Sequence, residues 1–398
     1  MTTIDRDEAL ASSSSLKEEV RSRAAALAPQ LAEQARAIDE ARRVPQELAD
    51  RLAQEGLLAI AHPWRHGGEG EYDTLLAATY ELGRGSGSVA WCHAVWTQHN
   101  WMIGLWPEQM RAEYFADGPD VRCSSAFNPV GAQVEAVDGG YRLSGRWSFS
   151  SGCDNAQWLM LGGFLRERQV GYLMVPRDEV EIVDTWFVSG LKGTGSKDVV
   201  VRDAFVPEHR VVTAASLSEA RVPEDVGERP SYALPVWPLV SLSLTYAVMG
   251  MTKGALDAVE ERLRAGLTGI AGNRPVDSAT MQLRVAQAAA EHDAALLLSE
   301  RATDDMLSRA EQGLEVSLED RARWARDRAF AARLCVQAVN RLFDGSGASG
   351  LYEQSPIQRF HRDVHAGSHQ PAHVWDVFGV YYGRQVLGLD LGPAARLI

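Results

Sequence analysis

The sequence predicts a mainly α-helical protein with a β domain in the middle of the chain. Apolar residues recur at helical spacings of three and four toward both ends, whereas residues 121–210 hold short, β-branched apolar runs separated by Gly, Asp or Pro. With 398 residues, 45% of them hydrophobic, the chain can bury a large core and is longer than one core usually organises. We therefore expect an N-terminal helical domain (1–120), an antiparallel β domain (121–215) and a C-terminal four-helix bundle (216–398).

Composition narrows the class of protein. The formal net charge is −13, and Lys and Arg form no run, so we expect no nucleic-acid partner and no anionic-membrane partner. The four cysteines lie far apart without a CxxC pair, which indicates neither a disulfide framework nor a zinc knuckle. The first residues lack an apolar segment and no run of about 18 apolar residues occurs, so we expect a soluble, cytoplasmic protein.

Helical patterns fill the N-terminal part. The serine-rich start is expected to be frayed until Ser15 caps a long amphipathic helix, which Pro29 should kink or split. A second helix is expected to begin at Pro45 and to stop at Gly56.

Residues 73–116 predict two more helices, separated near Gly83–Gly87. The second helix carries four tryptophans at intervals of five, which should point in different directions: Trp91, Trp96, Trp101 and Trp106. They fit core packing or the wall of a ligand cavity. His99 lies in this tract, where a packed core histidine and a catalytic one are both open interpretations.

The glycine-rich segment Gly190–Ser196 fits neither a Walker loop nor a dinucleotide fingerprint, so we expect a turn before the strand Val199–Phe205. A polar, proline-containing linker is expected at 215–235. Helical patterns then return and indicate a bundle of four helices, around 246–255, 281–296, 318–342 and 374–389.

An unusual polar elbow follows the predicted strand that begins at Tyr141. Two hydroxyls between aromatic rings, beside a glycine, would suit a flat heteroaromatic ring, although a serine-rich turn would explain the pattern equally well. The candidate cofactor-binding residues here are Trp147, Ser150, Ser151 and Gly152.

Four histidines recur at intervals of four near the C-terminus: His361, His365, His369 and His373. On an unbroken helix they would share one face and suggest a metal site. Gly367 and Pro371 interrupt such a helix, and no carboxylate accompanies the histidines as in HExxH. We therefore expect no metal.

The segment Trp147–Trp158 resembles the flavin-side strand of the acyl-CoA dehydrogenase superfamily. In particular it is similar to the branch of flavin-dependent oxygenases that includes the oxygenase components of para-hydroxyphenylacetate hydroxylase and secosteroid phenol hydroxylase, and dibenzothiophene monooxygenase. The predicted order of helices, β domain and helix bundle agrees with the fold that this resemblance implies.

One departure from the dehydrogenases favours the oxygenase branch. The dehydrogenases carry their catalytic glutamate before the last helix, where the matching segment here is His365–Ser368 and the glutamate position is Ala366. A second family location for that base offers Ser243 and no acidic neighbour. Without a carboxylate the chain cannot remove the α-proton of an acyl-CoA.

The resemblance also implies residue roles. His99 matches the histidine that hydrogen-bonds the substrate phenol and acts as its base, and Ser125 matches a serine at the same hydroxyl. Ser150 or Ser151 matches the hydroxyl near the central flavin ring nitrogen.

Two further positions follow from the resemblance. His369 matches the histidine near the peroxide oxygen, with His365 as the alternative. Arg274 resembles an arginine that reaches flavin phosphate from a neighbouring subunit, although a lone loop arginine is usually solvated.

The implied activity is that of an oxygenase component which hydroxylates an aromatic, phenolic small molecule through a flavin hydroperoxide. It would use oxygen and reduced FMN or FAD, supplied by a separate NAD(P)H-dependent reductase, and would assemble as a homotetramer. An acyl-CoA dehydrogenase or oxidase, an N- or S-oxygenase of the same fold, and a non-catalytic module remain alternatives.

Overall fold

The computed structural model describes residues 3–218, 229–265 and 274–391. Its first element, α1 (Thr3–Ala41), is one helix. It starts before the serine row and passes through Pro29, so the expected fraying as far as Ser15 is wrong, and of the kink or split expected at Pro29 the split is wrong. Close packing explains the continuity at Pro29: a Cβ added to Gly85 would lie 2.3 Å from the carbonyl oxygen of Ala28. Tertiary contacts thus stabilise the helix where proline removes a hydrogen bond.

The other N-terminal helices are α2 (Gln46–Gln54), α3 (Tyr72–Gly85), α4 (Gly87–Met102) and α5 (Glu108–Tyr114). The predicted stop at Gly56 is confirmed, since its φ is +69°. The break between α3 and α4 is also confirmed: Ser86 is extended, and its hydroxyl accepts from the N–H of Val89. Every residue of α4 is buried, which makes this helix the centre of the N-terminal part.

The β domain consists of two four-stranded sheets. The first has the order β1 (Cys123–Ala126), β4 (Trp158–Phe164), β5 (Val170–Pro176), β8 (Val211–Thr213). The second has the order β2 (Ala132–Val137), β3 (Gly140–Ser150), β7 (Lys197–Pro207), β6 (Val180–Val183).

The domain is not purely antiparallel, as the sequence predicts, because β1 and β4 pair in parallel with Ser125 opposite Met160. Strand direction depends on the path of the intervening chain, and β2 and β3 of the other sheet lie between these two strands in sequence. The predicted turn at Gly190–Ser196 is confirmed, since a short 3₁₀ helix there leads directly into β7.

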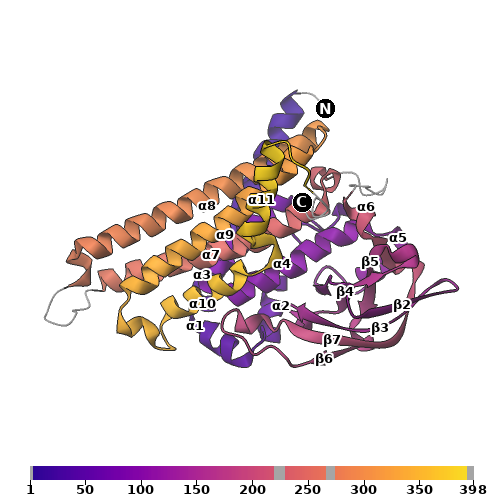
Figure 1. Cartoon of the computed structure of the whole chain (residues 1–398), viewed down its shortest axis with the longest axis horizontal. Coiled ribbons are helices and arrows are strands. Elements are labelled where there is room, and N and C mark those ends of the chain that lie inside the picture. Colours follow the sequence, from indigo (N-terminus) through magenta and orange to yellow (C-terminus); the bar gives the residue numbers. More distant parts are fainter. Residues whose placement is uncertain (1–2, 219–228, 266–273, 392–398) are drawn as a thin grey trace.

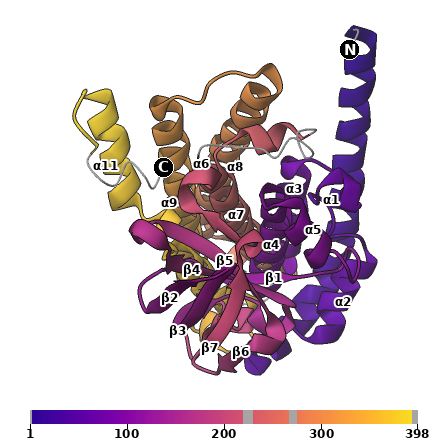
Figure 2. The ribbon, with the colours of Figure 1, turned by 90° about the vertical axis from the view of Figure 1, so that its right-hand side faces the viewer.

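The C-terminal helices that the structure describes are α7 (Val236–Arg264), α8 (Ala279–Gln312), α9 (Leu318–Gly345), α10 (Pro356–Ser368) and α11 (Trp375–Val386), after a short α6 (Ala214–Ser218). The polar helix α10 is additional to the four predicted ones and contacts α7 and α9. Figures 1 and 2 show α7, α8 and α9 side by side, and Figure 1 shows the β sheets at the end of the molecule away from the start of α8.

Among the described helices, α7 alone is long and apolar enough to cross a membrane by length and composition. In this fold 89% of the most apolar 18-residue segment of α7 is buried inside the protein, as expected for the central helix of the bundle.

Candidate active site

His99 on α4 is fully buried and has one nitrogen in use. Its Nδ1 lies 2.8 Å from the carbonyl oxygen of Cys123, and because a carbonyl only accepts, Nδ1 carries the ring proton. Nε2 is then an acceptor, and it has no hydrogen-bond partner among the described residues. Burial lowers the pKa of His99 to about 4, against a smaller raising effect of the Cys123 carbonyl. The ring is therefore a neutral base with an unused lone pair.

The strand β1 brings a hydroxyl to the same region. Side chains alternate along a strand, so Cys123 and Ser125 share the face turned toward α4, while Ser124 points to the opposite face. Ser125 is half-buried and lies two residues beyond the carbonyl that orients His99. The structure thus places Ser125 on the face of β1 that meets α4, the helix that carries His99.

A directed chain of hydroxyls lies at the end of β3. Trp91 Nε1 donates to Ser151 Oγ at 3.3 Å, and Thr194 Oγ1 donates to the carbonyl of Leu191 at 2.8 Å. Since the Thr194 proton is used, the 2.7 Å contact between Ser196 and Thr194 has Ser196 as donor. Ser151 must then donate to Ser196 across 2.8 Å. Sequence reasoning missed Thr194 and Ser196, because the glycine-rich turn around them was tested only as a phosphate loop.

Ser150 is polarised in the same way. Ser124 Oγ donates to the backbone oxygen of Ser151 at 2.8 Å, so Ser150 is the donor in its 2.7 Å contact with Ser124 Oγ. The hydroxyl protons of Ser150 and Ser151 are both engaged, and each oxygen keeps acceptor capacity. Such oxygens suit an N–H donor, and a reduced flavin carries an N–H at its central ring nitrogen that an oxidised flavin lacks.

Two candidate cofactor residues have other partners in this structure. Trp147 is 2% exposed in the core between the two sheets, and its Nε1 donates to the carbonyl of Gly162 at 2.8 Å. Gly152 has φ +68°, and the group that approaches it is Trp96, whose Nε1 donates to its carbonyl at 3.3 Å. The geometry argues against a direct flavin contact for Trp147. The space beside Gly152 is filled by the side chain of Trp96.

The aromatic ring that this elbow presents is Phe149. It is 72% exposed, has φ +66°, and meets Trp186 edge-on with 6.0 Å between ring centroids. Strand alternation would put Phe149 on the buried face with Trp147, but an irregularity in register between Trp147 and Ser150 turns it outward. A left-handed, exposed aromatic residue is a strained arrangement of the kind found at functional sites.

The histidines of α10 separate into two groups. His361 and His365 both turn to one acceptor on α9, the side-chain oxygen of Asn340, at 3.0 and 2.8 Å. His369 is exposed at the end of α10, where its Nδ1 donates to the carbonyl of His365 at 2.7 Å and leaves Nε2 available. Of the two candidates, the geometry favours His369, because the Nε2 of His365 is committed to Asn340.

The end of α10 lies against the tryptophan of the hydroxyl chain. A Cβ added to Gly367 would lie 3.2 Å from the ring of Trp91, which bonds Ser151. His373 takes no part in a shared histidine face, because it is buried with its nitrogens at 3.0 Å from Thr245 Oγ1 and 2.8 Å from the carbonyl of Gly367. No cluster of three metal-ligating side chains occurs in residues 3–218, 229–265 and 274–391.

Arg274 lies away from these groups within its own chain. It is exposed beside Asp277, at 3.8 Å, just before α8 begins. That end of α8 is the one farthest from the β sheets (Figure 1). A flavin bound at Ser151 could meet Arg274 only through another copy of the chain.

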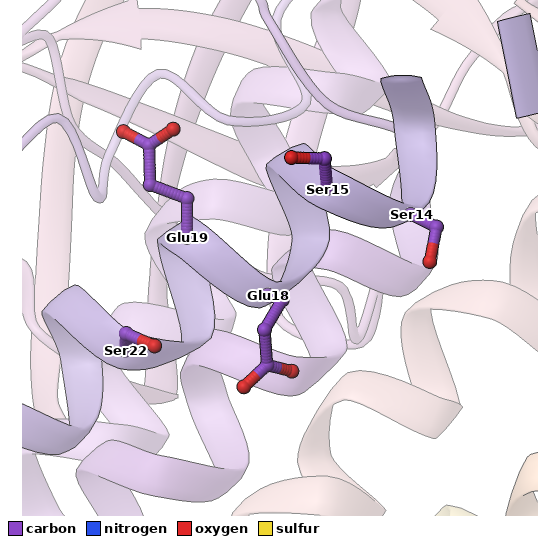
Figure 3. A pocket seen from close by; sticks show the side chains of 5 residues that line it. All are labelled: Ser14, Ser15, Glu18, Glu19 and Ser22. Carbon is purple, nitrogen blue, oxygen red and sulfur yellow. The ribbon is translucent and has the colours of Figure 1, made fainter. Parts of the chain in front are cut away.

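A surface hollow lies elsewhere, on α1 (Figure 3). One helix alone lines it, with side chains of Ser14, Ser15, Glu18, Glu19 and Ser22. It offers no imidazole, thiol or aromatic ring, and we assign no chemistry to it.

Two family models match the chain: the acyl-CoA dehydrogenase N-terminal domain over residues 14–114 and the C-terminal domain over residues 242–374. The oxygenase component of an FADH(2)-dependent resorcinol hydroxylase from Rhizobium sp. (strain MTP-10005) is 36% identical over 92% of this chain and 94% of its own. The chain belongs to the acyl-CoA dehydrogenase family, in its branch of flavin-dependent oxygenase components.

Other comparisons agree on this oxygenase branch. The oxygenase subunit HsaA of a flavin-dependent monooxygenase from Mycobacterium tuberculosis is 34% identical over 92% of this chain and 94% of its own. The crystal structure of HsaA from M. tuberculosis superimposes with a TM-score of 0.89 at 31% identity, over 95% of this chain and 99% of its own. The structure of XiaF from Streptomyces sp., in complex with FADH2 and glycerol, has a TM-score of 0.89 at 25% identity, over 98% of this chain and 99% of its own. Reduced flavin is the cofactor of this oxygenase component, and the predicted fold and family are confirmed.

Proposed function

We propose that this oxygenase component hydroxylates a small phenol, with His99 as the base on the phenol hydroxyl. The observation that carries the proposal is the buried Nε2 of His99, a lone pair without a partner in the described chain. The relatives named above include a resorcinol hydroxylase, and a further relative, from Acinetobacter baumannii, is the oxygenase component of p-hydroxyphenylacetate 3-hydroxylase at 27% identity. A phenol is the substrate class for which an unprotonated imidazole is useful.

His99 accepts a hydrogen bond from the neutral phenol before reaction. A base with a pKa near 4 does not remove the proton outright, so Nε2 takes the proton as the ring carbon ortho to the hydroxyl attacks the oxygen. Ser125 assists at the same phenol oxygen. Reduced flavin, when bound, supplies the activated oxygen.

Ser150 or Ser151 would accept from the N–H of the reduced flavin ring, and His369 would serve the oxygen that is transferred. The exposed ring of Phe149 would pack on the flavin. We favour FAD over FMN, because the resorcinol hydroxylase is named as FADH(2)-dependent and the XiaF structure contains FADH2. A separate NAD(P)H-dependent reductase supplies the reduced flavin in the cytoplasm.

The functional unit is a homotetramer in which Arg274 of one copy reaches the flavin phosphate of another. Arg274 is remote from Ser151 in its own chain, and large apolar side chains are exposed on α8 and after α11, including Leu297 and Leu387. We place the domain boundaries at 120/121 and 215/216.

The test is single-turnover hydroxylation. The protein is titrated anaerobically with reduced FAD or FMN, then mixed with oxygenated buffer with and without a phenol, and catechol-type product and hydrogen peroxide are measured. Product that appears only with the phenol, at the expense of peroxide, supports the proposal. Peroxide alone with every phenol, or oxidation of a sulfide or amine in place of the ring, would overturn it.

A further inference from the structure

Three aromatic rings contact one another, and one of them, Phe127, lies beside His99; we call the three the aromatic box: Phe127, Tyr172 and Trp237. Phe127 is central, with its ring centroid 5.7 Å from that of His99, 5.1 Å from Tyr172 and 5.5 Å from Trp237. Tyr172 and Trp237 are 5.7 Å apart. All four pairs are edge-to-face, with interplanar angles between 67° and 82°.

The box is built on the sheet face that also carries Ser125. Phe127 follows Ser125 by two residues, and Tyr172 of β5 pairs with Gly162 of β4, two rows beyond the row of Ser125 and Met160 and therefore on the same face. A glycine is needed at 162, because a Cβ there would lie 2.1 Å from the carbonyl oxygen of Phe127. Trp237, at the start of α7, closes the box from the helical side.

Tyr172 is 5% exposed, and its hydroxyl makes no hydrogen bond to any residue in 3–218, 229–265 or 274–391. Buried tyrosine hydroxyls normally have a partner. Burial raises the pKa of Tyr172 above its usual range, so the hydroxyl keeps its proton at neutral pH and can both donate and accept. The region around His99 thus contains the buried Nε2 of His99, which has no protein partner, and the hydroxyl of Tyr172, which makes no hydrogen bond within the described residues.

We propose that the Tyr172 hydroxyl binds a second polar substituent of the substrate, so that this oxygenase component selects benzene rings with two polar groups, such as a dihydroxybenzene, over simple phenols. The inference rests on the proposed function, because it assumes that the first hydroxyl of the substrate meets His99. The aromatic box holds the ring between the two anchors by edge and face contacts. A substrate without the second group lacks this hydrogen bond and therefore binds less tightly.

The test compares resorcinol with phenol in the wild-type oxygenase and in Tyr172→Phe, with reduced flavin supplied. In the variant the KM for resorcinol should rise about three- to tenfold, the effect of one neutral hydrogen bond. The KM for phenol and the kcat for both should change little. Anaerobic equilibrium dialysis of resorcinol against the protein loaded with reduced flavin should show the same loss of affinity without turnover.

The matched control is Tyr141→Phe, a tyrosine of β3 in the core between the sheets, which should leave both substrates unaffected. Equal changes for resorcinol and phenol in Tyr172→Phe, or none, would overturn this inference while leaving phenol hydroxylation by His99 intact. A wild-type protein that hydroxylates neither ring would remove the proposed function, and this inference with it.

Discussion

The Nδ1 of His99 and the carbonyl oxygen of Cys123 are 2.8 Å apart, and this hydrogen bond joins the buried helix α4 to the strand β1. It decides which imidazole nitrogen carries the proton and holds the ring so that its other nitrogen is free. The next residue, Ser124, bonds Ser150 and Ser151, so one short strand connects the base to the hydroxyls at the elbow of β3.

Replacing His99 should reduce hydroxylation far more than it reduces the consumption of reduced flavin. General-base assistance is worth about 10² to 10⁴ in rate, and His99→Ala should lose product at that scale and release hydrogen peroxide instead. The matched control is His93→Ala, a histidine buried on the same helix whose two nitrogens are bonded to Thr79 and Leu57. Wild-type coupling in His99→Ala would make His99 a packing residue.

The pH dependence of product formation should reflect the low pKa of His99. Burial lowers this pKa to about 4, and the active form is the unprotonated ring. Lowering the pH from 8 to 6 should therefore leave the yield of product per reduced flavin nearly constant, with a decline only as the pH approaches 4. An acid limb near 6.5 in single-turnover yields would indicate an exposed histidine and contradict the buried geometry.

Ser151→Ala should increase the share of oxygen released as hydrogen peroxide. The change removes the acceptor that we propose for the flavin N–H and breaks the chain from Trp91 to Ser196. Ser148→Ala, an exposed serine of β3 three residues before Ser151, serves as the control and should keep the wild-type ratio of product to peroxide. The measurement is peroxide and product yield per reduced flavin, and equal ratios in both variants would exclude Ser151 from the flavin site.

Gly152→Ala should destabilise the protein through Trp96. The new Cβ would lie 2.5 Å from Trp96 Nε1 at a φ of +68°, so backbone strain adds to overpacking, about 2–5 kcal/mol together. Gly139→Ala isolates the strain, since its φ is +74° with nothing within 4 Å, and should cost about 1–2 kcal/mol. Urea unfolding measures both, and equal costs would mean that Trp96 does not pack on Gly152.

Asp363 of α10 should make stability depend on pH in an unusual direction. It is buried, accepts from the N–H of Leu191 at 2.6 Å, and lies near Asp39, Arg359 and Arg362. Burial, followed by the charge of Asp39, raises its pKa from 3.8 to about 7. Because the folded state binds the proton more tightly, this group stabilises the fold least when ionised, and its contribution falls as the pH rises from about 4 to about 7.

Asp363→Asn keeps an acceptor for Leu191 but cannot ionise. The melting temperature of the variant relative to the wild type should therefore increase between pH 5 and pH 7 and level off above pH 7. A difference that is constant over this range would show that Asp363 does not titrate there.

The sequence by itself determined the order of helices, β domain and helices, because periods of 3.6 and 2 residues are local properties of the chain. It also showed that Ala366 stands where the dehydrogenases carry their catalytic glutamate, which separates the oxygenases from the dehydrogenases. The histidine and serine candidates for the site came from the sequence as well. The helix α10 was missed, because it carries only a few apolar residues, Ile357, Phe360 and Val364, and its histidines led the segment to be considered as a metal site.

Only the tertiary structure decided how the candidates are arranged. The tautomer of His99 depends on a carbonyl 24 residues away, and the polarity of the Ser151 hydroxyl depends on Trp91 and Ser196, 60 and 45 residues away. The exposure of Phe149 in place of Trp147 follows from an irregular register between two strands, and the loss of free space at Gly152 follows from the packing of Trp96. Such contacts join residues that are distant in the chain, and no local pattern of residues encodes which lone pair they leave free.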